Sequence, residues 1–147
     1  MATPAQLIQL VPGEGPAFSA VGDVYRFLAT GEQTGGAYVL SEARVLPGGG
    51  PPPHIHRRED EGFFVLEGEI TFTLGDKRVV AKPGSFIQGP RDIPHTFKNV
   101  GTSTGKLLLT DIPGRFADYF IDVDKVPDGD RELIRKLCAK YDVEILE

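Results

Sequence analysis

The sequence predicts an all-β fold, a closed or sandwich-like antiparallel barrel, followed by short C-terminal helices. Short apolar-rich segments alternate with turn residues as far as about residue 110, and no helix-length pattern lies between them. The Gly 18 and Pro 12 of the chain are spread along it, as tight turns between short strands require. At 147 residues the chain is long enough to bury one hydrophobic core. We therefore expect a single domain over residues 1–147, with a barrel core at about 37–110 and a helical segment at about 114–141.

The first third of the chain contains three candidate strands. Residues 6–11 are an apolar run that ends at Pro12, and we expect an edge strand there. Residues 24–29 alternate, with Tyr25, Phe27 and Ala29 on one face. Residues 37–46 form the next strand. The proline-rich residues 47–53 predict an irregular connection, because proline donates no ladder hydrogen bond.

The remaining strands follow at short intervals, at residues 61–66, 69–74, 77–81, 85–88, 95–100 and 106–110. Gly75-Asp76 predicts a tight turn and therefore a hairpin. Beyond Asp111, residues 115–120 predict one or two helical turns. Residues 128–140 predict a helix whose apolar positions share one face, followed by a short extended segment at 143–146; these apolar positions are Leu133, Ile134, Leu137 and Cys138.

Composition and charge exclude several classes of partner. The net charge of −5 argues against nucleic acid and against an anionic membrane surface. No stretch approaches the ~20 apolar residues that a membrane span needs, and the N-terminal residues do not have the pattern of a signal peptide. The single cysteine, Cys138, cannot form an intramolecular disulfide, and we expect it to be a small core residue. These features predict a cytoplasmic protein.

Three histidines and a glutamate have the pattern of a metal site. His54 and His56 are two residues apart, so on an extended strand both imidazoles point to one face. His95 comes from a later strand, and Glu61 supplies a carboxylate. Three imidazoles and one carboxylate are the ligands of many mononuclear metal sites. For any one histidine, a structural role with satisfied hydrogen bonds is the alternative.

The spacing around these residues resembles that of a known family. Five residues separate Gly48 from His54, four separate His56 from Glu61, and six separate Glu61 from Gly68. In the second segment the fixed positions are Gly84, Pro90, His95 and Asn99. This pattern resembles the two consensus motifs of the cupin superfamily. Asp92 stands where the second motif usually has glycine, and aspartate tolerates left-handed backbone better than most residues.

The resemblance implies a double-stranded β-helix, or jelly-roll barrel, that holds one divalent transition metal on His54, His56, Glu61 and His95. Iron, manganese, nickel, copper and zinc all accept such ligands. Glu59 and Asp60 are alternative carboxylates, and Glu61 is favoured because its six-residue gap to Gly68 also matches. We expect Arg57 and Arg58 to be solvated surface residues, and Asn99 to be a structural hydrogen-bonding residue.

Strand alternation gives candidates for an apolar wall of a substrate pocket, with core packing as the alternative for each. They are Tyr38, Phe63, Phe72, Phe86 and Phe97.

Residues 50–68 and 113–120 are similar to the corresponding segments of bacterial quercetin-dioxygenase-like single cupins. The resemblance implies a metal-dependent dioxygenase for a flavonol-like or other enolisable phenolic substrate. In it, Glu61 would bind the metal and act as the catalytic base. The alternatives are a non-catalytic binder of small molecules and a metal-dependent isomerase or lyase. We also expect a homodimer, because small barrels leave strand edges that a second copy can cover.

Overall fold

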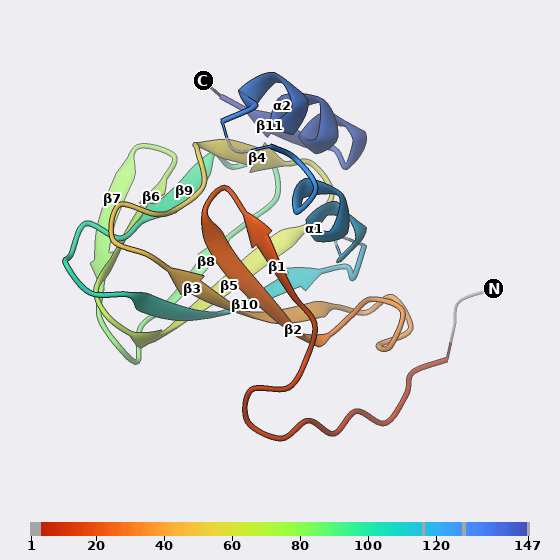
Figure 1. The fold of residues 1–147 in the computed structure, drawn as a ribbon. Helices are drawn as coiled ribbons and strands as arrows, with labels where there is room; N and C mark the ends of the chain where they lie inside the picture. Colours follow the sequence, from red (N-terminus) through yellow and green to blue (C-terminus); the bar gives the residue numbers. More distant parts are fainter. Residues whose placement is uncertain (1–3, 116, 128, 147) are drawn as a thin grey trace.

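The computed structural model describes residues 4–115, 117–127 and 129–146, which form a barrel of two antiparallel sheets (Figure 1). Its strands are β1 (Ala17–Ala20), β2 (Asp23–Ala29), β3 (Val39–Val45), β4 (His54–His56), β5 (Asp60–Glu67), β6 (Ile70–Leu74), β7 (Lys77–Ala81), β8 (Phe86–Gly89), β9 (His95–Lys98), β10 (Gly105–Ile112) and β11 (Val143–Ile145). A six-stranded sheet has the order β1-β2-β3-β10-β5-β8, and a five-stranded sheet has the order β11-β4-β9-β6-β7. The predicted all-β jelly-roll fold is confirmed.

The core lies between the two sheets and is filled by alternate strand positions. Tyr25, Phe27 and Ala29 of β2 are buried, which confirms the predicted inward face of this strand. Phe63 of β5 packs against Phe72 of β6 and Phe97 of β9, with ring centroids 5.3 and 5.7 Å away. This aromatic cluster therefore joins the two sheets, and Phe63 also lies 6.1 Å from the ring of His95.

The hairpins follow the turn residues. β6 and β7 pair in register across Gly75-Asp76, as predicted. β1 and β2 pair across Val21-Gly22, where both residues have positive φ, 53° and 87°. A β-branched residue such as Val21 rarely adopts this conformation, so a turn at this position is hard to predict from the residues.

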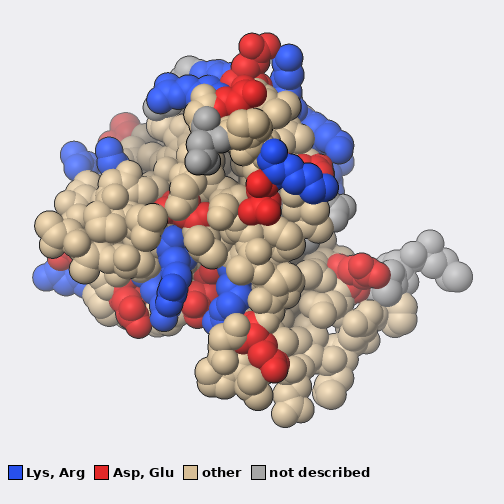
Figure 2. Space-filling view, viewed as in Figure 1, with Lys and Arg blue, Asp and Glu red and all other residues tan. Residues whose placement is uncertain are grey.

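The predicted edge strand at residues 6–11 is wrong. The first strand is β1, and the chain before it is an extended arm, residues 4–15, that projects from the barrel (Figure 1). Leu7 in this arm is 95% exposed. Figure 2 shows the arm as a largely uncharged extension of the surface, and Glu14 is its only charged residue.

Two short helices follow the barrel, α1 (Ala117–Val123) and α2 (Arg131–Lys140). α2 begins three residues later than predicted, because the Asp130 carboxylate accepts a hydrogen bond from Leu133 N and caps the helix there. Cys138 is buried on its inner face, as predicted. Phe116 and Asp128, which belonged to the predicted helices, and residues 1–3 lie outside the described residues.

The C-terminal segment returns to the barrel. β11 pairs with β4, placing Val143 opposite His56 and Ile145 opposite His54. The predicted extended segment is therefore confirmed, and it supports the strand that carries two of the three histidines. Neither described helix is long and apolar enough to cross a bilayer.

Candidate metal centre

Three strands bring the four predicted ligands together in the interior of the barrel. His54 and His56 lie on β4, His95 on β9, and Glu61 on β5 of the opposite sheet. His54 and His95 are direct partners across the β4–β9 pair. The four residues are buried, with exposed fractions of 7% for His54, 1% for His56, 6% for Glu61 and 3% for His95. One nitrogen or oxygen atom from each lies within 4.8 Å of those from the others.

Each imidazole has an acceptor next to its Nδ1 atom. His54 Nδ1 lies 2.8 Å from Pro52 O, and His95 Nδ1 lies 3.0 Å from Ile93 O. A carbonyl oxygen only accepts hydrogen bonds, so each of these contacts is donated by an N–H at Nδ1, which fixes the orientation of both rings. Histidines that bind metals use this arrangement, because it fixes the tautomer and the orientation of the ring.

Glu61 lies against the Nε2 side of two rings. Its Oε1 is 2.5 Å from His56 Nε2, and its Oε2 is 3.2 Å from His95 Nε2. A divalent metal could replace the protons shared across these contacts. The cluster holds imidazole nitrogens and one carboxylate, with no thiolate among its members. This donor set fits iron, manganese, nickel, copper or zinc, as expected, and does not select among them.

The pKa values follow from burial and from the proximity of these groups. Burial lowers the pKa of His54 to about 4, so this ring is neutral at pH 7. Burial also acts to lower the pKa of His56, but the Glu61 and Glu59 carboxylates outweigh burial and raise it to about 10. Burial acts to raise the pKa of Glu61, but the His56 and His95 rings hold it well below its usual range. Glu61 and His56 therefore form an ion pair in the chain without metal.

The structure separates the three candidate carboxylates. Glu61 faces the histidines. Glu59 is 1% exposed and contacts the Nδ1 side of His56, 3.4 Å away. Asp60 lies at the surface, where it pairs with Arg91 at 3.1 Å. The preference for Glu61 agrees with this geometry, and Glu59 is a neighbour that orients His56.

One acidic residue of the site was not predicted. Asp111 on β10 lies opposite Glu61 in the β10–β5 pair and is 1% exposed. Burial, followed by the charge of Glu61, raises the pKa of Asp111 well above its usual range. Asp111 could have been predicted as an inward residue. It lies two residues after Leu109 and four after Leu107, so strand alternation places all three on the same, inward face.

A small pocket of about 60 Å³ lies over the ligands, and we call it the inner pocket. His54, His56 and Glu61 line it together with three residues that were not predicted as site residues, Tyr25, Tyr119 and Cys138. The Cys138 thiol donates to the Tyr119 hydroxyl over 3.6 Å. Burial raises the pKa of both tyrosines, which therefore remain protonated phenols at neutral pH.

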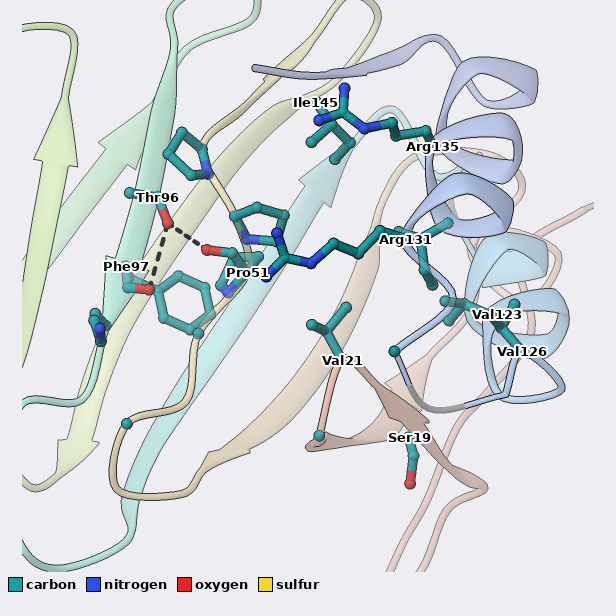
Figure 3. Close-up of a pocket in the computed structure, with 18 of the residues that line it drawn as sticks. Ser19, Val21, Pro51, Thr96, Phe97, Val123, Val126, Arg131, Arg135 and Ile145 are labelled. Carbon is teal, nitrogen blue, oxygen red and sulfur yellow. Dashed lines mark hydrogen bonds between the residues drawn. The ribbon is translucent and has the colours of Figure 1, made fainter. Parts of the chain in front are cut away.

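A second cavity of about 960 Å³, the outer cavity, adjoins the inner pocket (Figure 3). Six residues line both spaces and so connect them: Val21, Pro51, Pro52, Phe97, Ile134 and Ile145. The outer cavity is thus the space from which a small molecule could approach the ligands.

The predicted aromatic wall is only partly correct. Phe97 lines both cavities, whereas Phe63 and Phe72 are buried in the core. Tyr38 and Phe86 are wrong as pocket residues, because they are 40% and 61% exposed. Tyr38 precedes β3, whose inward positions begin at Val39, and Phe86 lies opposite the half-exposed Phe64 on the outer face of β8.

The other assignments near the site agree with the structure. Arg57 and Arg58 form surface ion pairs, Arg57 with Asp92 and Glu144 and Arg58 with Asp142. Asn99 is 1% exposed and donates to Val45 O and Ser103 O at 2.9 and 2.8 Å, so its role is structural. Asp92 has a φ of 66°, the left-handed conformation expected at the usual glycine position.

Comparisons with known proteins place these observations in a family context. Residues 41–111 match the family model described as Cupin domain. The chain is 24% identical over 111 residues to quercetin 2,3-dioxygenase of Bacillus subtilis, covering 76% of this chain and 33% of that protein. It is 31% identical over 101 residues to germin-like protein subfamily 2 member 1 of Arabidopsis thaliana, covering 61% of this chain and 46% of that protein. The chain thus spans less than half the length of either relative.

Two solved structures have the same fold. The polyketide cyclase RemF from Streptomyces resistomycificus is 26% identical with a TM-score of 0.64, over 73% of this chain and 80% of that chain. An RmlC-like cupin from Shewanella frigidimarina is 18% identical with a TM-score of 0.64, over 75% of this chain and 93% of that chain.

Proposed function

Because this chain is a member of the cupin superfamily, with a buried cluster of three histidines and a glutamate, we propose that it is a metal-dependent dioxygenase. Its substrate would be a flavonol-like or other enolisable phenolic compound. The observation that carries the proposal is the convergence of three Nε2 atoms and the Glu61 carboxylate beside a pocket that adjoins a large cavity. The similarity to the quercetin 2,3-dioxygenase supports it.

A bound divalent transition metal would supply a Lewis acid for the phenolate oxygen of the substrate and a redox partner for O2. The residues of this chain would prepare that site. Pro52 and Ile93 carbonyls and the Glu59 carboxylate hold the three rings by their Nδ1 atoms, so that Nε2 of each is available for the metal. These rings need little reorientation on metal binding, because their Nδ1 contacts already hold them, and a bound metal would displace the proton of His56 Nε2.

Glu61 is the residue placed to accept the proton of the substrate hydroxyl. His56 and His95 hold its pKa well below the usual range, so it is ionised at neutral pH, and Asp111 lies opposite it on β10. Tyr25 and Tyr119 line the inner pocket as neutral phenols, and the apolar Phe97, Leu109 and Val143 limit access of water. An ionised carboxylate beside a partly apolar pocket is the arrangement that deprotonation of a bound phenol would use.

The test is anaerobic loading of the metal-free chain with iron, manganese, nickel, cobalt or copper, followed by O2 uptake with quercetin. We expect uptake with at least one metal and loss of uptake in Glu61→Gln. The matched control, Glu67→Gln, changes an exposed glutamate on the same strand and should leave uptake unchanged. Absence of O2 consumption with every metal would reject the proposal.

A second candidate is non-redox chemistry, in which the metal acts only as a Lewis acid, as an isomerase, lyase or cyclase would use it. The similarity to a polyketide cyclase at 26% identity favours this candidate. Conversion of a phenolic substrate by the zinc-loaded chain under anaerobic conditions would support it over the dioxygenase. A third outcome, ligand-induced thermal stabilisation without turnover under any condition, would indicate a non-catalytic small-molecule binder.

We also propose that the chain forms a homodimer. Apolar residues of the extended arm and of the outer face at β8 lie exposed: Leu7 is 95% exposed, Val11 55% and Phe86 61%. Burial of these residues against a second copy would stabilise both copies. The strands β1 and β8 lie at the edges of their sheet, where backbone N–H and C=O groups can pair with a strand of the second copy. Light scattering at micromolar concentration should give twice the 16.0 kDa of one chain. A mass of one chain would contradict the dimer.

A further inference from the structure

The outer cavity has two chemically different parts. Near the inner pocket its wall is apolar, formed by the six residues that the two spaces share. The rest of its lining contains four basic side chains, Arg78, Lys98, Arg131 and Arg135, and two acidic ones, Asp124 and Asp130. The lining of this cavity therefore carries more positive than negative groups, although the whole chain has a net charge of −5.

Arg131 and Arg135 are placed by α2. They are four residues apart, and Ile134 lies between them, so the three side chains share one face of the helix. In Figure 3 both arginine side chains extend from α2 toward the wall that carries Pro51 and Ile145. Ile134 also lines the inner pocket. The same face of α2 therefore carries both a residue shared by the two cavities and the two arginines of the outer cavity.

The two acidic side chains of the cavity lining each accept a hydrogen bond from a backbone N–H. Asp124 accepts a hydrogen bond from Ser19 N at 2.7 Å, and Asp130 accepts one from Leu133 N at 3.0 Å. Within the described part of the chain, no carboxylate forms an ion pair with Arg131 or Arg135. Two lysines on another face of α2 are paired, Lys136 with Glu132 and Lys140 with Asp122. Among the described residues, the two arginines that line the cavity thus have no carboxylate partner, whereas the two lysines on the other face of α2 each have one.

The ordinary interpretation of Arg131 and Arg135 is that they are solvated surface residues. Two features indicate that they also bind a ligand. The guanidinium groups lie at the mouth of a cavity that leads to the candidate metal centre. Planar guanidinium groups also recognise carboxylates in a bidentate manner, and their attraction is stronger at a concave surface than at an open one.

We propose that Arg131 and Arg135 bind a carboxylate of the substrate in the outer cavity, while the apolar wall contacts its aromatic part and its hydroxyl faces the metal centre. The substrate class is then a phenolic carboxylate, with the acidic group at the end away from the reacting hydroxyl. The orientation of the hydroxyl rests on the proposed function, whereas the carboxylate site rests on the cavity alone.

The test uses 3-hydroxyflavone with a 4′-carboxylate and its neutral 4′-carboxamide as matched probes, with flavonol fluorescence as the readout of binding. Titrations are made with the metal-free chain and with the zinc-treated chain. We expect the carboxylate to bind about 10-fold more tightly than the carboxamide to the native chain. Raising NaCl to about 0.5 M should weaken binding of the carboxylate and leave the carboxamide unchanged.

The variant R131Q/R135Q should reduce the preference to less than about 2-fold. The matched control K136Q/K140Q removes the same charge from another face of the same helix and should keep the preference. Equal binding of the two probes by the native chain, or a preference that survives R131Q/R135Q, would overturn the proposal. Tighter binding of a 4′-phosphate, with no preference for the carboxylate, would replace it with a phosphorylated ligand.

These results separate the two proposals. A carboxylate preference in the metal-free chain, together with no O2 uptake for any metal, would retain the anion site and reject the dioxygenase. O2 uptake with quercetin and no carboxylate preference would retain the dioxygenase and reject the anion site.

Discussion

The carboxylate of Glu59 lies 3.4 Å from Nδ1 of His56, while Nε2 of the same ring faces Glu61. The imidazole is thus held between two buried carboxylates, one on each nitrogen. Nε2 thus contacts a member of the candidate metal centre, whereas Nδ1 contacts Glu59, which is not a member. Glu59 therefore acts on the candidate metal centre through His56, and we regard it as a positioning residue.

Replacement of Glu59 by glutamine should weaken metal binding without unfolding the chain. Glutamine keeps the size of the side chain but removes the charge that orients and polarises His56, and partners of this kind contribute about 10- to 100-fold in metal affinity. The measurement is the Kd for Zn²⁺ by competition with a chromophoric chelator. Glu59→Asp should restore part of the affinity, and Glu67→Gln on the outer surface should have none of the effect. Unchanged Zn²⁺ affinity in Glu59→Gln would show that Glu59 does not position the ring.

The stability of the chain should fall between about pH 4 and pH 6 because of Asp23. This residue is 1% exposed, and burial raises the pKa of its carboxyl from 3.8 to about 6. Because the folded pKa is the higher one, the protonated carboxyl favours the folded state. Its contribution is complete below about pH 4 and is lost as the pH rises through 6, by at most about 3 kcal/mol.

The variant Asp23→Asn isolates this effect. The free energy of unfolding of the native chain minus that of the variant, from urea titrations, should decrease as the pH rises from 4 to 7. Asp76→Asn, in the exposed β6–β7 turn, serves as the control and should show no such trend. A flat difference for Asp23→Asn would mean that the buried carboxyl titrates normally.

Asn99 should be among the more sensitive structural positions. Its Nδ2 donates to Val45 O and Ser103 O, and its Oδ1 accepts from Gly101 N at 3.0 Å. Alanine would leave the buried Val45 O without this donor and would also remove the part-buried bonds to Ser103 O and Gly101 N; a buried unpaired group costs about 1–3 kcal/mol. We expect Asn99→Ala to lower the free energy of unfolding by roughly 2–4 kcal/mol. Thr102→Ala in the exposed part of the same loop should change it by less than about 0.5 kcal/mol.

Asp92 tests whether the left-handed backbone at the start of the His95 loop is required. Its φ is 66°, and its N–H donates to His56 O at 2.8 Å. We expect Asp92→Gly to be at least as stable as the native chain, because the exposed ion pair with Arg57 contributes little. Asp92→Val should be less stable by about 1–2 kcal/mol. Equal stability of the valine variant would contradict a fixed left-handed conformation there.

The features predicted correctly from the sequence depend on local period and on short spacings. The shared face of His54 and His56 follows from the two-residue repeat of a strand. The inward face of β2 and the burial of Cys138 follow from strand alternation and helical periodicity in the same way. These patterns depend on a few consecutive residues, so they can be predicted without knowing which distant segments come into contact.

The features that were missed depend on which segments become neighbours. Phe86 begins the four-residue β8, where either face can be the inner one until its partner β5 is known. The run at residues 6–11 has no sheet edge beside it, so its apolar residues remain exposed. The position of Arg131 and Arg135 in the lining of the outer cavity depends on how α2 packs, so it could not be predicted from the sequence.

The proposed function depends on the binding of one divalent metal by His54, His56, Glu61 and His95 together. The most direct measurement is the metal content, by mass spectrometry, of the chain purified without chelator, beside the variant His54→Ala/His95→Ala. We predict about one equivalent of a transition metal per chain in the native protein, none in the variant, and an unchanged fold in both. A native chain that carries no metal and takes up none from iron, manganese, nickel, copper or zinc would contradict the claim.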